Sequence, residues 1–197
     1  MSAVALVVLG GLPGTGKTTL AGALAGRLGW TVLSSDRIRK ELAGIQPDAD
    51  GRTAFGTGIY STSWTARTYA ELLRRAGELL ARDESVILDA SWSSAEMRAA
   101  AADVARAHDA SLVELRCVAS PGLARKRLTA RPPGPSDAGP EIAARLAAAA
   151  APWPAATVID TEAGGAPGGE PARFGSGFEQ IVTHALAAIR QRDHEPR

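Results

Sequence analysis

A glycine-rich segment near the start of the chain has the residue types and spacing that most clearly support chemistry. It reads G-x-x-x-x-G-K-T, directly after the apolar run "AVALVVL". Glycines let successive backbone N–H groups point to one side, where they hold phosphate together with the start of the following helix. The lysine suits the β- and γ-phosphates of a nucleotide, and the threonine hydroxyl suits a magnesium ion. The motif predicts a phosphate-binding loop made of Gly11, Leu12, Pro13, Gly14, Thr15, Gly16, Lys17, Thr18 and Thr19.

Two aspartates follow apolar runs and are placed to act beside this loop. Asp89 ends "SVILD", and Asp36 comes just after "TVLS". The carboxyl ends of parallel strands share one edge of a sheet, where ligands bind. We therefore expect Asp89 to hold magnesium with Thr18, and Asp36 to accept the proton of an attacking hydroxyl. Helix capping is the alternative for both, with Asp36 capping a helix over 37–42 and Asp89 capping one that starts near Ser93.

The elements that must position these residues follow from an alternation of apolar runs and helical segments. The apolar runs, rich in Val, Ile and Leu, are 3–9, 31–34, 85–89, 111–118 and 156–160. The helical segments are 17–28, 64–82, 94–108 and 121–130. A terminal helix over 178–192 presents one packing face made of Phe178, Ile181, Val182, Ala185 and Ile189. This alternation predicts an α/β fold around a parallel sheet.

Length and composition describe a single globular domain over residues 1–197. Apolar residues make up 45% of the chain and charged residues 22%, a mixture that supports a full core. The net charge of +1 gives no strong field for a polyanion, which weighs against nucleic acid as a partner. The single cysteine, Cys117, excludes an internal disulfide and fits a cytoplasmic protein. No apolar run reaches the roughly 18 residues of a membrane span, so we expect no membrane partner.

These motifs resemble the small P-loop kinases, which include polynucleotide kinases, gluconate kinases and zeta toxins. The resemblance covers about residues 3–161 and rests on the glycine loop, the D-x-x-R of "SSDRIRKEL", and "VILDASW". It is closest to the ATP-binding half of bacterial proteins that fuse an aminoglycoside-phosphotransferase-like domain to such a kinase, through "GIYS…W…TY", "DASW", an Arg-rich helix, "SDA" and "VIDT". The sequence given departs from them in lacking a fused domain and in a Gly/Pro-rich segment, 163–177, that we expect to be flexible.

The resemblance implies a three-layer P-loop NTPase fold with a five-stranded parallel sheet of order 2-3-1-4-5 and helices on both faces. It also implies ATP as phosphate donor, Mg²⁺ as metal, and a lid over residues 119–140. In such kinases, arginines of the lid close over the phosphates and stabilise transition-state charge. Arg127 and Arg131 share a helix face here and are expected in that role, with Arg125 and Lys126 beside them. A solvated basic helix face is the alternative for any one of them.

The acceptor site is predicted from residues that flank the strand ends bearing the two aspartates. Arg39 follows Asp36 by one helical turn and is suited to an acceptor or a phosphate. The other candidates that could line the site are Tyr60, Trp64, Trp92 and Arg98. Stacking of the tryptophans on a base or sugar is one interpretation, and aromatic packing between helices is the other.

The chain is therefore expected to be an ATP- and Mg²⁺-dependent phosphotransferase acting on a hydroxyl of a small molecule. No N-K-x-D motif is present, which argues against a GTPase. A polynucleotide or nucleotide end-kinase is one alternative, and an ATP-binding regulatory module without acceptor chemistry is another. The sequence leaves open the identity of the acceptor, and whether the chain is a monomer or a homodimer.

Overall fold

The predicted strands form one parallel sheet whose centre is β1. A computed structural model describes residues 4–46, 58–130, 139–162 and 176–192 of the chain. The strands are β1 (Ala5–Gly11), β2 (Thr31–Ser34), β3 (Val86–Asp89), β4 (Ser111–Val118) and β5 (Thr157–Asp160). They lie in the order β2-β3-β1-β4-β5, and all neighbouring pairs are parallel. The predicted fold class and strand order are confirmed.

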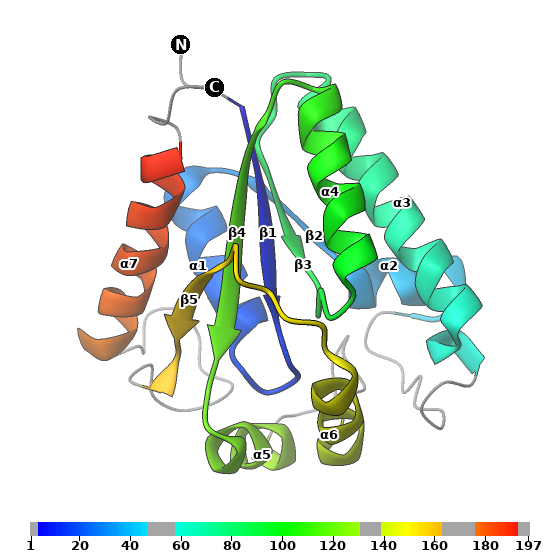
Figure 1. Ribbon diagram of the computed structural model, residues 1–197, viewed down its shortest axis with the longest axis vertical. Coiled ribbons are helices and arrows are strands. Elements are labelled where there is room, and N and C mark those ends of the chain that lie inside the picture. Colours follow the sequence, from blue (N-terminus) through cyan, green and yellow to red (C-terminus); the bar gives the residue numbers. More distant parts are fainter. Residues whose placement is uncertain (1–3, 47–57, 131–138, 163–175, 193–197) are drawn as a thin grey trace.

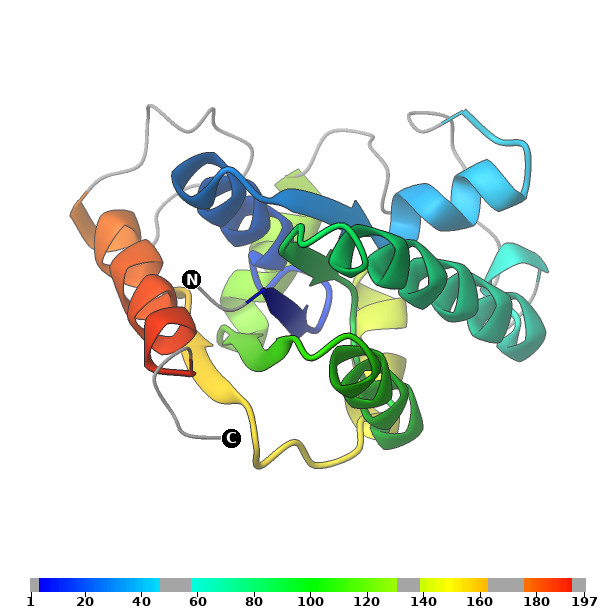
Figure 2. The same ribbon diagram turned by 90° about the horizontal axis from the view of Figure 1, so that it is seen from above.

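Helices cover both faces of this sheet (Figure 1). One face is covered by α1 (Lys17–Leu28) and α7 (Ser176–Arg192), and the other by α3 (Thr62–Leu80) and α4 (Ala95–Ala107). The remaining helices are α2 (Ser35–Leu42), the short 3-10 helix η1 (Gly58–Tyr60), α5 (Pro121–Ala130) and α6 (Pro140–Ala149). Figure 1 shows α5 and α6 beyond the carboxyl ends of the strands, and Figure 2 shows α1 and α7 well apart from α3 and α4.

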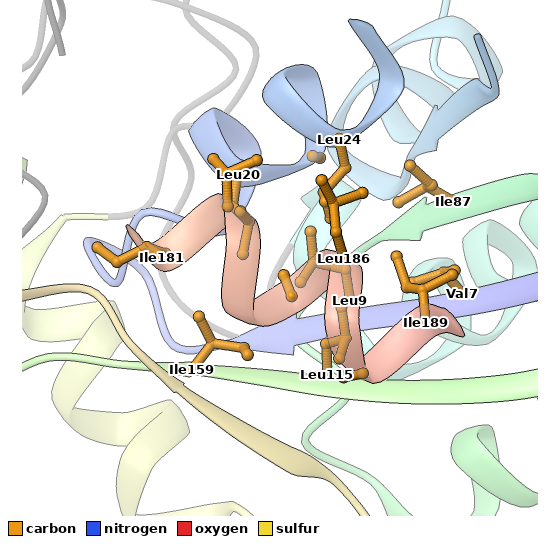
Figure 3. Packing of buried hydrophobic residues seen from close by; sticks show 14 of the residues in the cluster. Val7, Leu9, Leu20, Leu24, Ile87, Leu115, Ile159, Ile181, Leu186 and Ile189 are labelled. Carbon is orange, nitrogen blue, oxygen red and sulfur yellow. The ribbon is translucent and has the colours of Figure 1, made fainter. Parts of the chain in front are cut away.

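The core is divided by the sheet because successive side chains of β1 point to opposite faces. Val7 and Leu9 pack toward α1 and α7, whereas Leu6 and Val8 pack toward α3 and α4. Every residue of β1 is buried, as expected for a central strand between two helical layers. In Figure 3, the apolar side chains of α7 interlock with those of α1 and the sheet. The predicted packing face of the terminal helix is confirmed, since Phe178, Ile181, Val182, Ala185 and Ile189 are all buried.

The helix starts correct the capping alternatives. The helix predicted over 37–42 begins at Ser35 instead, and its N-cap is Ser34, so Asp36 lies inside the first turn. The N-cap of α4 is Ser94, whose hydroxyl accepts a hydrogen bond from the Met97 backbone. Asp36 and Asp89 are therefore not helix caps, and that alternative is wrong for both.

Several predicted features lie outside the described residues. They are Arg131, residues 131–138 of the expected lid, and residues 163–175 of the Gly/Pro-rich segment. Within the described ranges, no helix is long and apolar enough to cross a membrane.

Candidate functional site

The predicted phosphate loop connects β1 to α1 at the carboxyl edge of the sheet. Gly14 and Gly16 each adopt a left-handed conformation with φ of 83°, which glycine accepts without steric cost. A Cβ on Gly14 would come within 2.5 Å of the Ala124 carbonyl oxygen in α5, so only glycine fits there. Gly16 is the N-cap of α1. Among the described residues, no side chain caps this end of the helix, and its first turn contains no acidic residue. The N–H groups and the positive dipole end of α1 are therefore suited to an anion.

The two residues predicted to hold magnesium are in contact. The Thr18 hydroxyl donates to Asp89 Oδ2 over 2.7 Å. Asp89 is only 3% exposed, and its Oδ1 has no hydrogen-bond partner among the described residues. Burial raises the pKa of Asp89, and the nearby positive charge of Lys17 opposes that rise. A buried carboxylate oxygen without a partner beside a hydroxyl fits Mg²⁺, which prefers a few protein oxygens together with phosphate and water.

No richer metal site is present in the described part of the chain. It contains no group of three or more His, Cys, Asp or Glu side chains close enough to bind an ion together.

Asp36 and Arg39 lie on α2, next to the carboxyl end of β2. Asp36 is half-buried, and its charge raises the pKa of Asp89, so the two carboxylates lie within electrostatic reach of each other. Arg39 is 6% exposed, and its Nη1 donates to the Ile59 carbonyl oxygen over 2.7 Å. The Arg39 guanidinium also lies 4.9 Å from the ring centroid of Tyr60, a cation–π distance. The structure thus brings three of the predicted acceptor-side residues into one cluster.

Two other predicted acceptor residues, Trp92 and Arg98, are placed beneath the surface of the site. Trp92 is fully buried, and its indole N–H donates to the Leu88 carbonyl oxygen over 3.2 Å. Arg98 donates to the carbonyl oxygens of Trp92 and Pro152, at 2.7 Å each. Burial lowers the pKa of Arg98. These positions agree with the packing interpretation of Trp92.

Trp64, the remaining aromatic candidate, lies in the first turn of α3. Its side chain is half-buried, and the Arg67 guanidinium lies 5.2 Å from its ring centroid. It therefore sits at the outer side of the acceptor cluster, where one ring face is already covered by a cation.

Sequence reasoning missed a buried tyrosine beneath the loop that follows β3. The Tyr69 hydroxyl accepts from the Trp92 backbone N–H at 3.1 Å and lies 3.2 Å from the Ser91 hydroxyl. Trp92 has a φ of 52°, a left-handed conformation that is unusual for so large a residue. Tyr69 thus supports a strained loop between Asp89 and the acceptor side. The signal available was the "TY" of residues 68–69, which belongs to the family resemblance but had no assigned role.

The predicted lid arginines differ in their surroundings. Arg127 is 9% exposed and lies behind the phosphate loop, bonded to Thr161. Arg125 and Lys126 are exposed on α5, and Arg131 lies outside the described residues. Thr161 had no predicted role.

Comparisons with known proteins add to this geometry. A model of the family described as "AAA domain" matches residues 6–152. The chain is 40% identical over 158 residues to an uncharacterized protein of Mycobacterium tuberculosis strain H37Rv, a match that covers 80% of this chain and 32% of the relative. The chain thus spans about a third of the length of the curated relatives it matches.

Solved structures resemble the chain over nearly its whole length. A gluconokinase from Sinorhizobium meliloti is 19% identical with a TM-score of 0.59, covering 96% of this chain and 93% of that one. An APS kinase of Mycobacterium tuberculosis, in complex with AMPPNP and APS, is 20% identical with a TM-score of 0.59, covering 96% and 99%. At these identities the likeness is one of fold, and it confirms the resemblance to the small P-loop kinases at that level.

Proposed function

The chain belongs to the AAA domain family, and on that premise we propose that it is an ATP- and Mg²⁺-dependent kinase of small molecules. The observation that carries the proposal is the meeting of three charged groups at one edge of the sheet. Asp89 is bonded to Thr18, and its pKa responds to both Lys17 and Asp36. A phosphate-binding loop, a metal-binding pair and a second carboxylate are the parts that phosphoryl transfer to an acceptor requires.

The loop supplies the nucleotide contacts in this proposal. The backbone N–H groups at the start of α1 bind the phosphates, and Lys17 reaches the β- and γ-phosphates. Thr18 and Asp89 hold Mg²⁺, which when bound offsets negative charge on those phosphates. Likeness in fold to an APS kinase complexed with AMPPNP supports the choice of an adenine nucleotide.

Asp36 is the proposed general base. The acceptor oxygen forms a bond to the γ-phosphorus while the bond from that phosphorus to the β,γ-bridging oxygen breaks. The hydroxyl proton passes to the Asp36 carboxylate, and the bridging oxygen leaves as part of ADP. Asp36 is half-buried on α2, one helical turn before Arg39. Its carboxylate therefore lies near Arg39 and the rest of the acceptor cluster. A regulatory module without acceptor chemistry would not need a carboxylate there.

The proposal is tested by following ADP and phosphorylated acceptor together. The 197-residue chain is incubated with ATP–Mg²⁺ and single acceptors, starting with gluconate and APS because kinases of these names share the fold. We expect ADP formation to require an acceptor and to match the amount of phosphorylated product. ATP binding without turnover on any hydroxyl acceptor would instead identify a regulatory module. Turnover that occurs only on DNA or RNA ends, with a steep salt dependence, would identify an end-kinase.

A further inference from the structure

A buried polar network ties the back of the phosphate loop to α5 and to the residue that follows β5. Arg127 Nη1 donates to the Thr161 hydroxyl at 3.0 Å and to the Gly14 carbonyl oxygen at 3.5 Å, while Nη2 donates to the Thr161 carbonyl oxygen at 2.7 Å. The Thr161 hydroxyl in turn donates to the Thr15 carbonyl oxygen at 2.7 Å. Two segments distant in sequence therefore converge on two consecutive loop carbonyls, those of Gly14 and Thr15.

These bonds determine which way the loop's N–H groups point. A trans peptide is planar, so its C=O and N–H point in opposite directions. Holding the Thr15 carbonyl from behind therefore aims the Gly16 N–H forward, into the concave side of the loop. The preceding peptide is held in a similar way, because the Thr15 N–H donates to the Leu12 carbonyl oxygen at 3.2 Å while the Gly14 carbonyl faces Arg127.

The guanidinium is held in place for this task at a cost in desolvation. Arg127 is 9% exposed, and its hydrogen-bond partners among the described residues are two carbonyls and a hydroxyl rather than a carboxylate. Burial accordingly lowers the pKa of Arg127. A positive charge behind the loop also favours an anion in front of it. Orientation and charge would thus both act on a bound phosphate from behind the loop.

We infer that Arg127 and Thr161 are positioning residues that orient the phosphate loop from behind, with Arg127 acting through Thr161 and the Gly14 carbonyl rather than by contact with ATP. This differs from the lid role expected for Arg127 from the family. This positioning role rests on the nucleotide-binding part of the proposed function. It assigns to two residues outside the loop the orientation that the loop needs to bind phosphate.

Binding of AMPPNP–Mg²⁺ and of inorganic pyrophosphate to the full chain, measured by titration calorimetry, tests this role. Pyrophosphate lacks adenine, so a loss shared by both ligands reports on the phosphate loop alone. Thr161→Val keeps the side-chain shape but removes the hydroxyl, and we expect about tenfold weaker binding of both ligands, the equivalent of one net hydrogen bond. Thr161→Ser restores the hydroxyl and should bind within about twofold of the wild type. Thr157→Val, at an exposed position of β5, the strand that precedes Thr161, is the matched control.

A double-mutant cycle separates positioning from direct contact. Arg127→Met should also weaken binding of both ligands about tenfold. The double variant Arg127→Met/Thr161→Val should bind only slightly more weakly than either single variant, because both substitutions break the same hydrogen-bond network. Arg127→Lys, which retains charge but not the forked geometry, provides a second route if Thr161→Val does not fold, and should bind several-fold more weakly. All titrations are made where circular dichroism shows each variant fully folded.

Three results would overturn the inference. They are unchanged binding by folded Thr161→Val, full additivity in the cycle, or a loss seen with AMPPNP but absent with pyrophosphate. A wild-type chain that binds neither ligand would overturn the proposed function as well. A wild-type chain that binds both, with variants that bind equally well, would overturn the positioning role alone.

Discussion

The two sides of the site hold unusual backbone conformations by different means. On the phosphate side, defined here as residues 11–19 with Asp89, Arg127 and Thr161, the left-handed positions are glycines. On the acceptor side, defined as Asp36, Arg39, Tyr69, Ser91 and Trp92, the left-handed position is a tryptophan. Glycine accepts this conformation freely, whereas a bulky residue there costs about 1–3 kcal/mol that its surroundings must offset.

The surroundings of Trp92 do offset that strain. Its backbone N–H donates to Tyr69, its carbonyl accepts from Arg98, and its indole donates to Leu88. The Tyr69 and Trp92 rings also meet edge to face, with centroids 5.0 Å apart. The phosphate side is thus shaped by its own backbone, while the acceptor side depends on side chains from α3 and α4. The two sides should therefore respond separately to substitution.

The largest expected effect is on the phosphate side. Lys17→Ala removes the cation that would bridge the β- and γ-phosphates, so we expect both nucleotide binding and transfer to be lost while the fold survives. Thermal stabilisation by ATP–Mg²⁺ should disappear in this variant and persist in Arg82→Ala, an exposed position after α3. Stabilisation that is unchanged in folded Lys17→Ala would show that the loop is not the nucleotide site.

The next largest effect is expected on the acceptor side. Asp36→Asn removes the proposed proton acceptor but keeps the side-chain size, so transfer should fall by roughly 10²–10⁴. AMPPNP affinity should stay near normal, because Asp36 is not part of the phosphate loop. Stability should fall by no more than about 1 kcal/mol, the usual contribution of a carboxylate in a first helical turn. Asp103→Asn, on the exposed face of α4, is the matched control.

A folded Asp36→Asn variant with full transfer activity would assign the base to another group, with Asp89 as the next candidate. Loss of nucleotide affinity together with transfer would show that the two sides are not separable. Either result would break the comparison on which this prediction is based.

The phosphate side was readable from sequence because its constraints are local. A short motif predicts the loop and the start of α1 at Lys17. The contact of Thr18 with the end of β3 follows because the carboxyl ends of parallel strands share one edge of the sheet. The predicted strand 3–9 nevertheless ended two residues early, since β1 includes Gly10 and Gly11. Gly10 belongs to the strand because it pairs with Arg116 of β4, and the Trp153 ring fills the space where a Cβ on Gly10 would lie.

The supports behind both sides could not be predicted because they join residues that are distant in sequence. Tyr69 reaches Trp92 across 23 positions, and Arg127 reaches Thr161 across 34. No residue type signals such a partner, and a tryptophan at positive φ has no local signature. The same limit applies to Arg98, whose bonds to the carbonyls of Trp92 and Pro152 also join distant parts of the chain.

A moderate effect should come from the support of the strained loop. Tyr69→Phe keeps the ring but leaves the buried Trp92 N–H without its partner, which should cost about 1–3 kcal/mol of stability. Transfer should fall by about tenfold through displacement of the loop, while AMPPNP affinity is kept. Ser91→Ala is the matched variant, since it leaves the Tyr69 bond to Trp92 intact and should cost less stability. If Tyr69→Phe lowered AMPPNP affinity as much as it lowered transfer, the claim that the two sides respond separately to substitution would be contradicted.

The smallest effect concerns a group of ion pairs on α3, one of which joins α3 to α2. Arg75 donates to Glu71 of its own helix and to Glu41 of α2, at 2.7 Å each, and Arg74 also bonds Glu71. Hydrogen bonds from Arg74 and Arg75 lower the pKa of Glu71 from 4.5 to about 2. A folded-state pKa below the unfolded value stabilises the protein above about pH 4.5, and this contribution is lost as the pH falls toward 2. Solvent screening limits it to about 0.5–1 kcal/mol.

The test is urea unfolding of the wild type and Glu71→Gln at pH 6 and pH 3. Glu71→Gln should be the less stable of the two at pH 6, by about 0.5–1 kcal/mol, and the difference should shrink at pH 3, where the wild-type carboxylate begins to take up its proton. Glu84→Gln, an exposed glutamate in the turn after α3, should show no such pH dependence.

The phosphate side should respond with the opposite sign, because burial raises the pKa of Asp89, so its protonation favours the folded state as the pH falls. If the wild type and Glu71→Gln differed in free energy of unfolding by the same amount at pH 6 and pH 3, the Glu71 ion pairs would not contribute to acid sensitivity. The predicted opposite response of Asp89 would then have no counterpart in α3.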